Sequence, residues 1–182
     1  MTDALPPLTL VKELFHALSK GKHICVDDGD LYFALHRRYP EYEILFGQLG
    51  FALRRHPRNF FYFDGDDVGD VAQRIAVFFY ILVEHIGDRG LAVEEAIMAR
   101  EWNVSELPHF SSDRYRGYMQ QVGVTGPDDM QRLVLTRLES LGFSAWIPPD
   151  QFRFRAEAYR LLDLCIAAAG SGTSTPTPEA SR

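Results

Sequence analysis

Cysteine is scarce in this sequence, with Cys25 and Cys165 as the two among 182 residues. They form no C-x-x-C pair and have no cluster of other ligands nearby, so we expect two buried free thiols and no metal site. Long apolar runs are lacking too: the longest charge-free stretch in an expected helix covers residues 75–83, whereas a bilayer span needs about 20 residues. No basic segment precedes an apolar one near Met1. We therefore expect no secretory signal, no membrane contact and a cytoplasmic location.

Positive charge is not in excess. Lysine and arginine number 19 against 25 acidic residues, which gives a net charge of −6. A histone-like protein that coats DNA is excluded, and any DNA contact must come from a local patch. Hydrophobic residues make up 46% and charged residues 24%, which is typical of a soluble globular protein. The length allows one ordinary domain or two small ones.

Catalytic motifs are missing as well. The sequence has no H-E-x-x-H, no G-x-S-x-G and no glycine-rich phosphate loop, so we expect no enzymatic activity and no cofactor. The acidic stretch 64–70 has Asp at positions 1 and 3 and Gly at position 6 of an EF-hand loop. However, Val68 stands at position 5 and Ile75 at position 12, where calcium needs an oxygen ligand. A linker whose aspartates cap the next helix is the stronger interpretation.

The first half has the order of elements of a winged helix-turn-helix. The expected elements are a helix around residues 10–18, a short strand at 23–26, a helix around 28–35, a helix from 40 to 50, and a hairpin over 51–63. Apolar periodicity indicates the helices, and alternating aromatic residues around Pro57 indicate the hairpin.

The second half begins with a long helix expected over residues 68–85. Its apolar residues surround most of the helix, so it should be buried on several sides. We expect part of it, at Phe78, Phe79, Tyr80 and Ile81, to form a dimer or partner surface. Further helices are expected at residues 93–100, at 113–121 and from Pro127 to Leu141, the last with either Val134 or Leu135 on its apolar side.

Two parts of the sequence repeat one pattern. Residues 49–51 and 141–143 both read Leu-Gly-Phe, and each triplet is followed by a proline turn and by alternating aromatics. A hairpin packed on its preceding helix would explain both copies. We therefore predict a mainly α fold with small β-hairpins (α+β), built from tandem winged-helix domains over residues 8–64 and 68–169. A polar, disordered tail is expected over residues 170–182.

Arginines cluster around the two predicted hairpins. The candidate DNA-binding residues are Arg37, Arg38, Arg54, Arg55, Arg58, Arg153 and Arg155. Cations at a wing tip suit contact with phosphates, while the alternative is a solvated polar face that protects an edge strand. The helix from Glu41 to Leu49 carries no arginine, lysine or asparagine, so specific base recognition is weakly supported.

Four short runs resemble the MksE family, the small subunits of MukBEF-like bacterial condensins. These runs are residues 59–63, 112–119, 138–143 and 152–155, and the resemblance covers about residues 10–168. It implies a non-catalytic, MukE-like tandem winged-helix (KITE) subunit that forms a homodimer and binds the kleisin MksF.

Through the kleisin, such a subunit would join the SMC ATPase MksB on the nucleoid, in chromosome condensation and segregation or in plasmid defence. From the arginines around the hairpins we expect weak, largely sequence-independent contact with double-stranded DNA. The alternative is a winged-helix transcription regulator.

Overall fold

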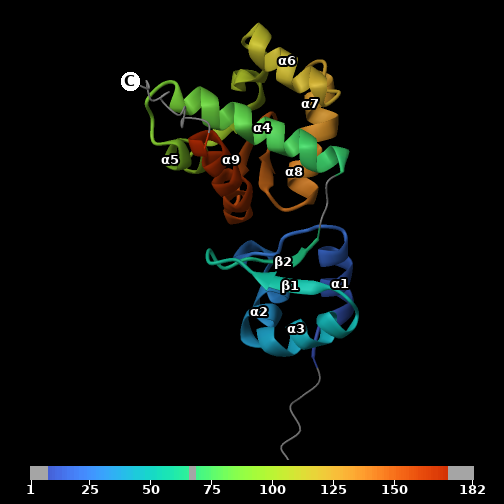
Figure 1. The fold of residues 1–182 in the computed structure, drawn as a ribbon. Helices are drawn as coiled ribbons and strands as arrows, with labels where there is room; N and C mark the ends of the chain where they lie inside the picture. The colour runs from blue at the N-terminus through green and yellow to red at the C-terminus, as the bar shows by residue number, and fades with distance from the viewer. Residues whose placement is uncertain (1–7, 66–68, 172–182) are drawn as a thin grey trace, which may run out of the picture.

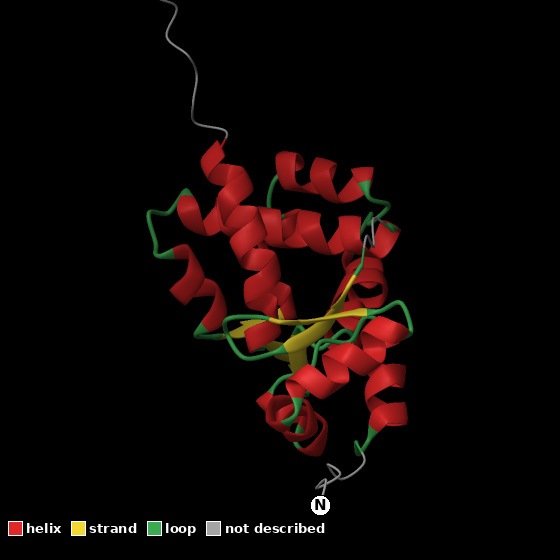
Figure 2. Cartoon of the chain, turned by 60° about the horizontal axis from the view of Figure 1, so that its bottom comes forward, coloured by secondary structure: helices red, strands yellow, loops and turns green. Residues whose placement is uncertain are grey.

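The computed structural model describes residues 8–65 and 69–171 and shows a mixed α+β chain. Helices dominate, and the strands form one two-stranded and one three-stranded antiparallel sheet. The N-terminal half lies below the helical C-terminal half in Figure 1, and Figure 2 shows how little of the fold is strand. The predicted fold class is thus confirmed as helical with small β-hairpins.

The N-terminal half contains the three helices and the hairpin predicted for it, with a single bridge at Ile24 in place of the predicted first strand. They are α1 (Val11–Ser19), α2 (Asp30–Arg37), α3 (Tyr39–Gln48), β1 (Ala52–Arg55) and β2 (Phe61–Asp64), with a 3-10 turn at Val26–Asp28. β1 and β2 form a hairpin, which we call the first wing. Ile24 forms an antiparallel bridge with Phe61 on the far side of β2. The strand order is therefore Ile24, β2, β1.

The C-terminal half starts with α4 (Asp70–Gly87) and ends with α9 (Tyr159–Ser171), two helices that pack together. Between them lie α5 (Val93–Met98), β3 (Glu101–Asn103), α6 (Asp113–Gln121), α7 (Pro127–Met130), α8 (Thr136–Ser140), β4 (Ser144–Ile147) and β5 (Gln151–Phe154). Short 3-10 turns occupy Val104–Glu106, Pro108–Phe110 and Ala156–Ala158. The β4–β5 hairpin is called the second wing. Its sheet has the order β3, β5, β4.

The two halves therefore repeat one arrangement. Each contains a helix, a short strand, two helices and a hairpin, and in each the first strand pairs with the last strand of the hairpin. Each half also has its own apolar core, one built around Leu14, Leu35 and Phe46 and the other around Phe78, Val134 and Leu138. This is the order of elements on which the winged-helix prediction rests.

The surface predicted on α4 requires a correction. Phe78, Phe79 and Ile81 are 0% exposed, because α9, α5 and α6 of the same chain pack around α4. They are core residues and do not offer a surface to a second subunit. Tyr80 is half-buried, and its hydroxyl lies 3.4 Å from Glu84.

The helix that begins at Pro127 is interrupted. A π-helical turn at Gln131–Leu135 separates α7 from α8, and the hydroxyl of Thr136 donates to the carbonyl oxygen of Gln131 at 2.8 Å. Val134 and Leu135 are both buried. The wider turn places both side chains against the core, whereas the sequence pattern required a choice between them.

Two expectations fall partly outside the described residues. α9 runs to Ser171, two residues into the expected tail, and residues 172–182 are not described. The acidic stretch weighed as a calcium loop includes residues 66–68, which also lie outside. Among the described helices, no span is long and apolar enough to cross a membrane.

Candidate nucleic-acid interface and the junction between the halves

The predicted DNA-binding arginines lie in three different environments. Arg37, Arg38, Arg54 and Arg55 lie around the corner between α2 and α3 and on the neighbouring strand β1. Arg153 lies on the exposed face of β5, and Arg58 and Arg155 make contacts with the opposite half of the chain. The structure thus brings together four of the predicted cations and separates the rest.

Tyr39 connects the corner to the strand. Its hydroxyl lies 2.9 Å from the carboxylate of Glu43 and 3.0 Å from the carbonyl oxygen of Leu53. Its ring packs on Phe61, and the guanidinium of Arg55 lies over the same Phe61 ring at 5.9 Å. Burial and the Glu43 carboxylate raise the pKa of Tyr39 to about 12, so the hydroxyl stays protonated near neutral pH.

The cations of this corner have weak surface partners. Arg54 lies 3.3 Å from Asp64 across the hairpin, Arg38 lies 3.1 Å from Glu41 on the next helix, and Arg55 donates to the Asn59 amide oxygen at 2.8 Å. The Arg54–Asp64 pair is exposed, and such an ion pair contributes about 0–1 kcal/mol. A phosphate could therefore replace the exposed partners of Arg54 and Arg55 at little cost.

The outer face of α3 carries no exposed cation. Its exposed residues include Glu43, Gln48 and Ile44, the last 63% exposed. An acidic and apolar face does not suit the major groove, where arginine, lysine and asparagine carry most base recognition. This geometry argues against a reader of specific bases.

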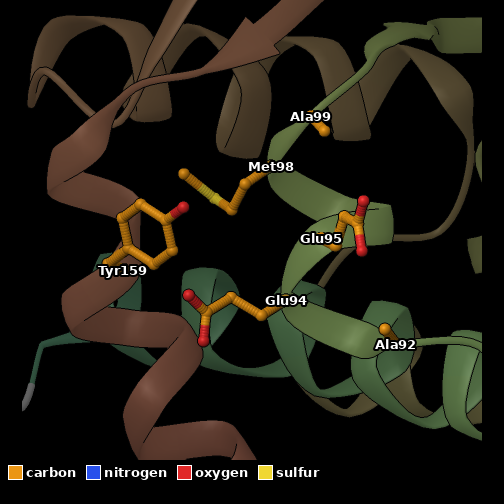
Figure 3. A pocket seen from close by; sticks show the side chains of 6 residues that line it. All are labelled: Ala92, Glu94, Glu95, Met98, Ala99 and Tyr159. Atoms are coloured by element: carbon orange, nitrogen blue, oxygen red, sulfur yellow. The ribbon is translucent and has the colours of Figure 1, made fainter.

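Arg58, at the tip of the first wing, is held by the C-terminal half. It donates to the Glu94 carboxylate at 2.7 Å, and its guanidinium lies 3.5 Å from the centre of the Tyr159 ring. Glu94 and Tyr159, but not Arg58, line an open pocket of about 370 Å³ between α5 and the start of α9, together with Ala92, Glu95, Met98 and Ala99. In Figure 3, Glu94 and Met98 lie toward Tyr159, while Glu95 points away from it.

Arg153 lies on the exposed face of the second sheet. In the strand register it stands between Glu101 of β3 and Ala145 of β4. Its neighbours in β5, Phe152 and Phe154, are buried on the other face. The predicted alternation of aromatic and basic side chains is present up to the end of this strand.

Arg155 does not belong to a DNA-facing surface, and its assignment is corrected. Its side chain is 12% exposed and lies 3.0 Å from Asp28 and 3.3 Å from Glu157, whose side chains are 8% and 0% exposed. β5 ends at Phe154, so the chain turns and places Arg155 inside the junction between the halves. A buried charge is tolerated only with such partners.

The buried groups around Arg155 form what we call the junction cluster: Lys22, Cys25, Asp28, Arg155 and Glu157. Lys22 lies 2.6 Å from Asp28, and the backbone N–H of Cys25 donates to Asp28 at 2.9 Å. Burial alone would raise the pKa of Asp28, but these hydrogen bonds and the nearby Arg155 lower it. Burial raises the pKa of Glu157 despite Arg155 and, with the Glu157 carboxylate beside it, raises that of Cys25 to about 11.

The junction cluster also contains three potential metal ligands. One ligand atom each from Cys25, Asp28 and Glu157 lies within 4.8 Å of the others. The Nη2 atom of Arg155 lies 3.0 Å from the Cys25 sulfur and 3.0 Å from an Asp28 oxygen. The guanidinium already provides the positive charge among these groups, so they form an ion-pair cluster rather than a metal centre.

A second set of polar contacts lies at His23. Its backbone N–H donates to the carbonyl oxygen of Leu141 at 3.0 Å, and Arg160 lies 2.9 Å from its Nε2 atom. Since Arg160 can only donate, Nε2 accepts, and Nδ1–H donates to the carbonyl oxygen of Gly21 at 3.1 Å. Burial and Arg160 lower the pKa of His23 to about 3. The neutral ring is therefore part of the junction.

A family model described as condensin complex protein MksE matches residues 9–166. The chain belongs to the MksE family. The resemblance inferred from four short runs is thereby confirmed, and the match spans both halves of this MksE-family chain. A comparison with curated proteins finds no relative that matches it.

The junction of this MksE-family chain was not predicted from sequence. Arg155 and Asp28 are 127 positions apart, and Arg160 and His23 are 137 positions apart. Neither pair has a local spacing that would reveal it. One signal was available at Gly142, where a Cβ atom would lie 2.8 Å from the carbonyl oxygen of His23. The repeated Leu-Gly-Phe triplet marked this glycine, but only as the end of a helix.

Proposed function

We propose that this chain is a non-catalytic accessory subunit of a bacterial condensin-like SMC complex. The observation that carries the proposal is the match to the MksE family over residues 9–166. In this role the chain binds a kleisin subunit of the MksF type and acts through it with an SMC ATPase of the MksB type. It works as a homodimer, on the nucleoid, in chromosome organisation.

Copurification tests the assembly directly. The tagged protein is isolated from its native cells, and bound proteins are identified by mass spectrometry. A large coiled-coil ATPase and a kleisin-sized protein in stable ratio are the expected result. Recovery of the protein alone, together with discrete promoter fragments, would instead favour a winged-helix transcription regulator.

We further propose that the corner formed by α2, α3 and β1 contacts DNA phosphates. Arg37, Arg54 and Arg55 are exposed there and Arg38 is half-buried beside them, which supports a contact that is weak and independent of base sequence. The acidic outer face of α3 is consistent with this, because it offers nothing for base recognition. The net charge of −6 requires the contact to be local, with one face of the subunit turned toward DNA.

Charge reversal tests the DNA contact. Arg54→Glu with Arg55→Glu should weaken DNA binding by the assembled complex and reduce the dependence of log affinity on log salt by about two, since each phosphate contributes about 0.9. Arg132→Glu with Arg137→Glu is the matched control, with the same change in charge on the C-terminal half. Equal salt dependence in both double variants and the parent would contradict the proposed surface.

A further inference from the structure

The pocket between α5 and α9 has a lining suited to one kind of side chain. Tyr159 provides an aromatic face, Glu94 a carboxylate, and Met98 a flexible apolar surface. Glu94 and Met98 are four positions apart on α5 and so lie on one side of the helix. An aromatic face beside a carboxylate suits an arginine, whose planar guanidinium can stack and donate hydrogen bonds at once.

The chain itself places an arginine against two residues of the lining. Arg58 stacks on Tyr159 at 3.5 Å and donates to Glu94 at 2.7 Å. It reaches the pocket from the other half of the chain, 36 positions before Glu94. The contact shows which ligand chemistry Glu94 and Tyr159 accept, and it comes from a turn in which Pro57 and Asn59 are also exposed.

The contact of Arg58 with Glu94 is open to solvent. Glu94 is 45% exposed and Arg58 is 38% exposed on their side chains, and Ala92 and Ala99 leave an exposed apolar rim beside it. An exposed ion pair of this kind is weak. A second arginine that brings an apolar neighbour for the rim could therefore displace the wing tip.

We propose that Glu94 and Tyr159, together with the adjoining pocket, form a docking site for an arginine side chain of a partner polypeptide, flanked by an apolar residue, and that Arg58 contacts these two residues in the free chain. Binding of the partner exchanges one guanidinium for another at Glu94 and Tyr159. The exchange also releases the tip of the first wing. This proposal goes beyond the assembly proposed above and does not depend on it, because it concerns a site within this chain alone.

The test uses the full chain and a blocked Leu-Arg-Leu tripeptide as the probe. Binding is followed by NMR of ¹³C-labelled methionine methyl groups, because Met98 lines the pocket while Met119 and Met130 are buried elsewhere in the core. The Met98 signal should shift with saturation, and the two core signals should stay in place. The same tripeptide with citrulline in place of arginine has the shape without the charge and should not bind.

Three variants test whether peptide binding depends on the pocket itself or only on the negative charge of the protein. Arg58→Ala should bind the tripeptide about threefold more tightly or better, since an exposed pair and a cation–π contact no longer compete. Glu94→Gln should bind about fivefold more weakly. Glu106→Gln, a matched control because this exposed glutamate lies outside the pocket lining, should change affinity by less than about twofold.

Three results would overturn the docking site. They are equal affinity of the parent and Arg58→Ala, equal affinity for the arginine and citrulline peptides, and equal losses in Glu94→Gln and Glu106→Gln. An unshifted Met98 signal at millimolar peptide in Arg58→Ala would also overturn it. Since the probe contains neither DNA nor another subunit, these results leave the proposed condensin role to be judged by copurification.

Discussion

Replacing Arg155 with methionine should cost more stability than any surface charge change in this protein. The substitution keeps an unbranched side chain but removes the cation beside the buried Glu157 and leaves Asp28 with Lys22 as its cationic partner. Their side chains are 8% and 0% exposed. Removing one partner of a buried ion pair costs about 3–5 kcal/mol, because the remaining charge stays buried.

The size of the effect can be read from thermal unfolding. In a chain of this length, about 1 kcal/mol shifts the melting temperature by roughly 2–4 °C, so Arg155→Met should lower it by about 6–20 °C in calorimetry. Because Asp28 and Arg155 belong to different halves, the unfolding transition of the variant should also be broader than that of the parent, or split. Arg153→Met, two residues earlier and exposed, is the control and should shift stability by less than about 0.5 kcal/mol.

The pH dependence gives an independent check. The pKa of Asp28 is lowered in the folded chain, so its contribution is present above the unfolded value of about 4 and is lost as the pH falls below it. The difference in the free energy of unfolding between the parent and Arg155→Met should therefore become smaller at acidic pH. Three results would refute this account of the junction cluster. They are a loss of stability below about 1 kcal/mol in Arg155→Met, an equal loss in Arg153→Met, and a stability difference between parent and Arg155→Met that does not depend on pH.

Three more predictions concern the junction, the histidines and the wing. Gly142→Ala should destabilise the chain by about 1–3 kcal/mol in urea unfolding, since the new Cβ lies 2.8 Å from a backbone oxygen. The control is Gly50→Ala, where φ is also positive but the space around the new Cβ is open. It should cost about 1 kcal/mol or less. His23 and His109 have pKa values lowered by burial to about 3 and about 4, so stability should fall as the pH drops from about 6.5 toward 4, where the unfolded chain binds the extra protons; a flat profile over this range contradicts it. Glu94→Gln should strengthen DNA binding by the assembled complex and steepen its salt dependence by about one, because it frees an arginine for phosphate; unchanged binding would mean that the freed arginine does not reach DNA.

The sequence predicted most of the helices and both hairpins, because their signals are local. Apolar spacings of three and four marked α1 and α3, and glycine followed by alternating aromatics marked both wings. β3 was missed since it has three residues and pairs with β5 some fifty positions later. A strand held only by such distant pairing has little pattern of its own.

Burial within one chain and burial between two chains look the same in a sequence. The apolar surface all around α4 predicted several packed neighbours, and the structure provides them as α9, α5 and α6. Nothing in the residues of α4 could distinguish these helices from a second subunit. The prediction for Arg155 was wrong for a related reason. Alternation along a strand would place its side chain on the same face as that of Arg153, but β5 ends at Phe154. The alternation therefore does not extend to Arg155.

The junction has a mechanical consequence. Each half has an apolar core of its own, whereas the contact between them includes hydrogen bonds and ion pairs at His23, Asp28 and Arg155, beside ring contacts such as that of His23 with Phe143. Such bonds are lost once donor and acceptor separate beyond about 3.5 Å, while a core resists until many packed side chains part together. When force is applied across the two halves, we expect the junction between them to open first, while each half stays folded. The two halves could then separate and rejoin reversibly, and the force needed to separate them would vary with salt and pH.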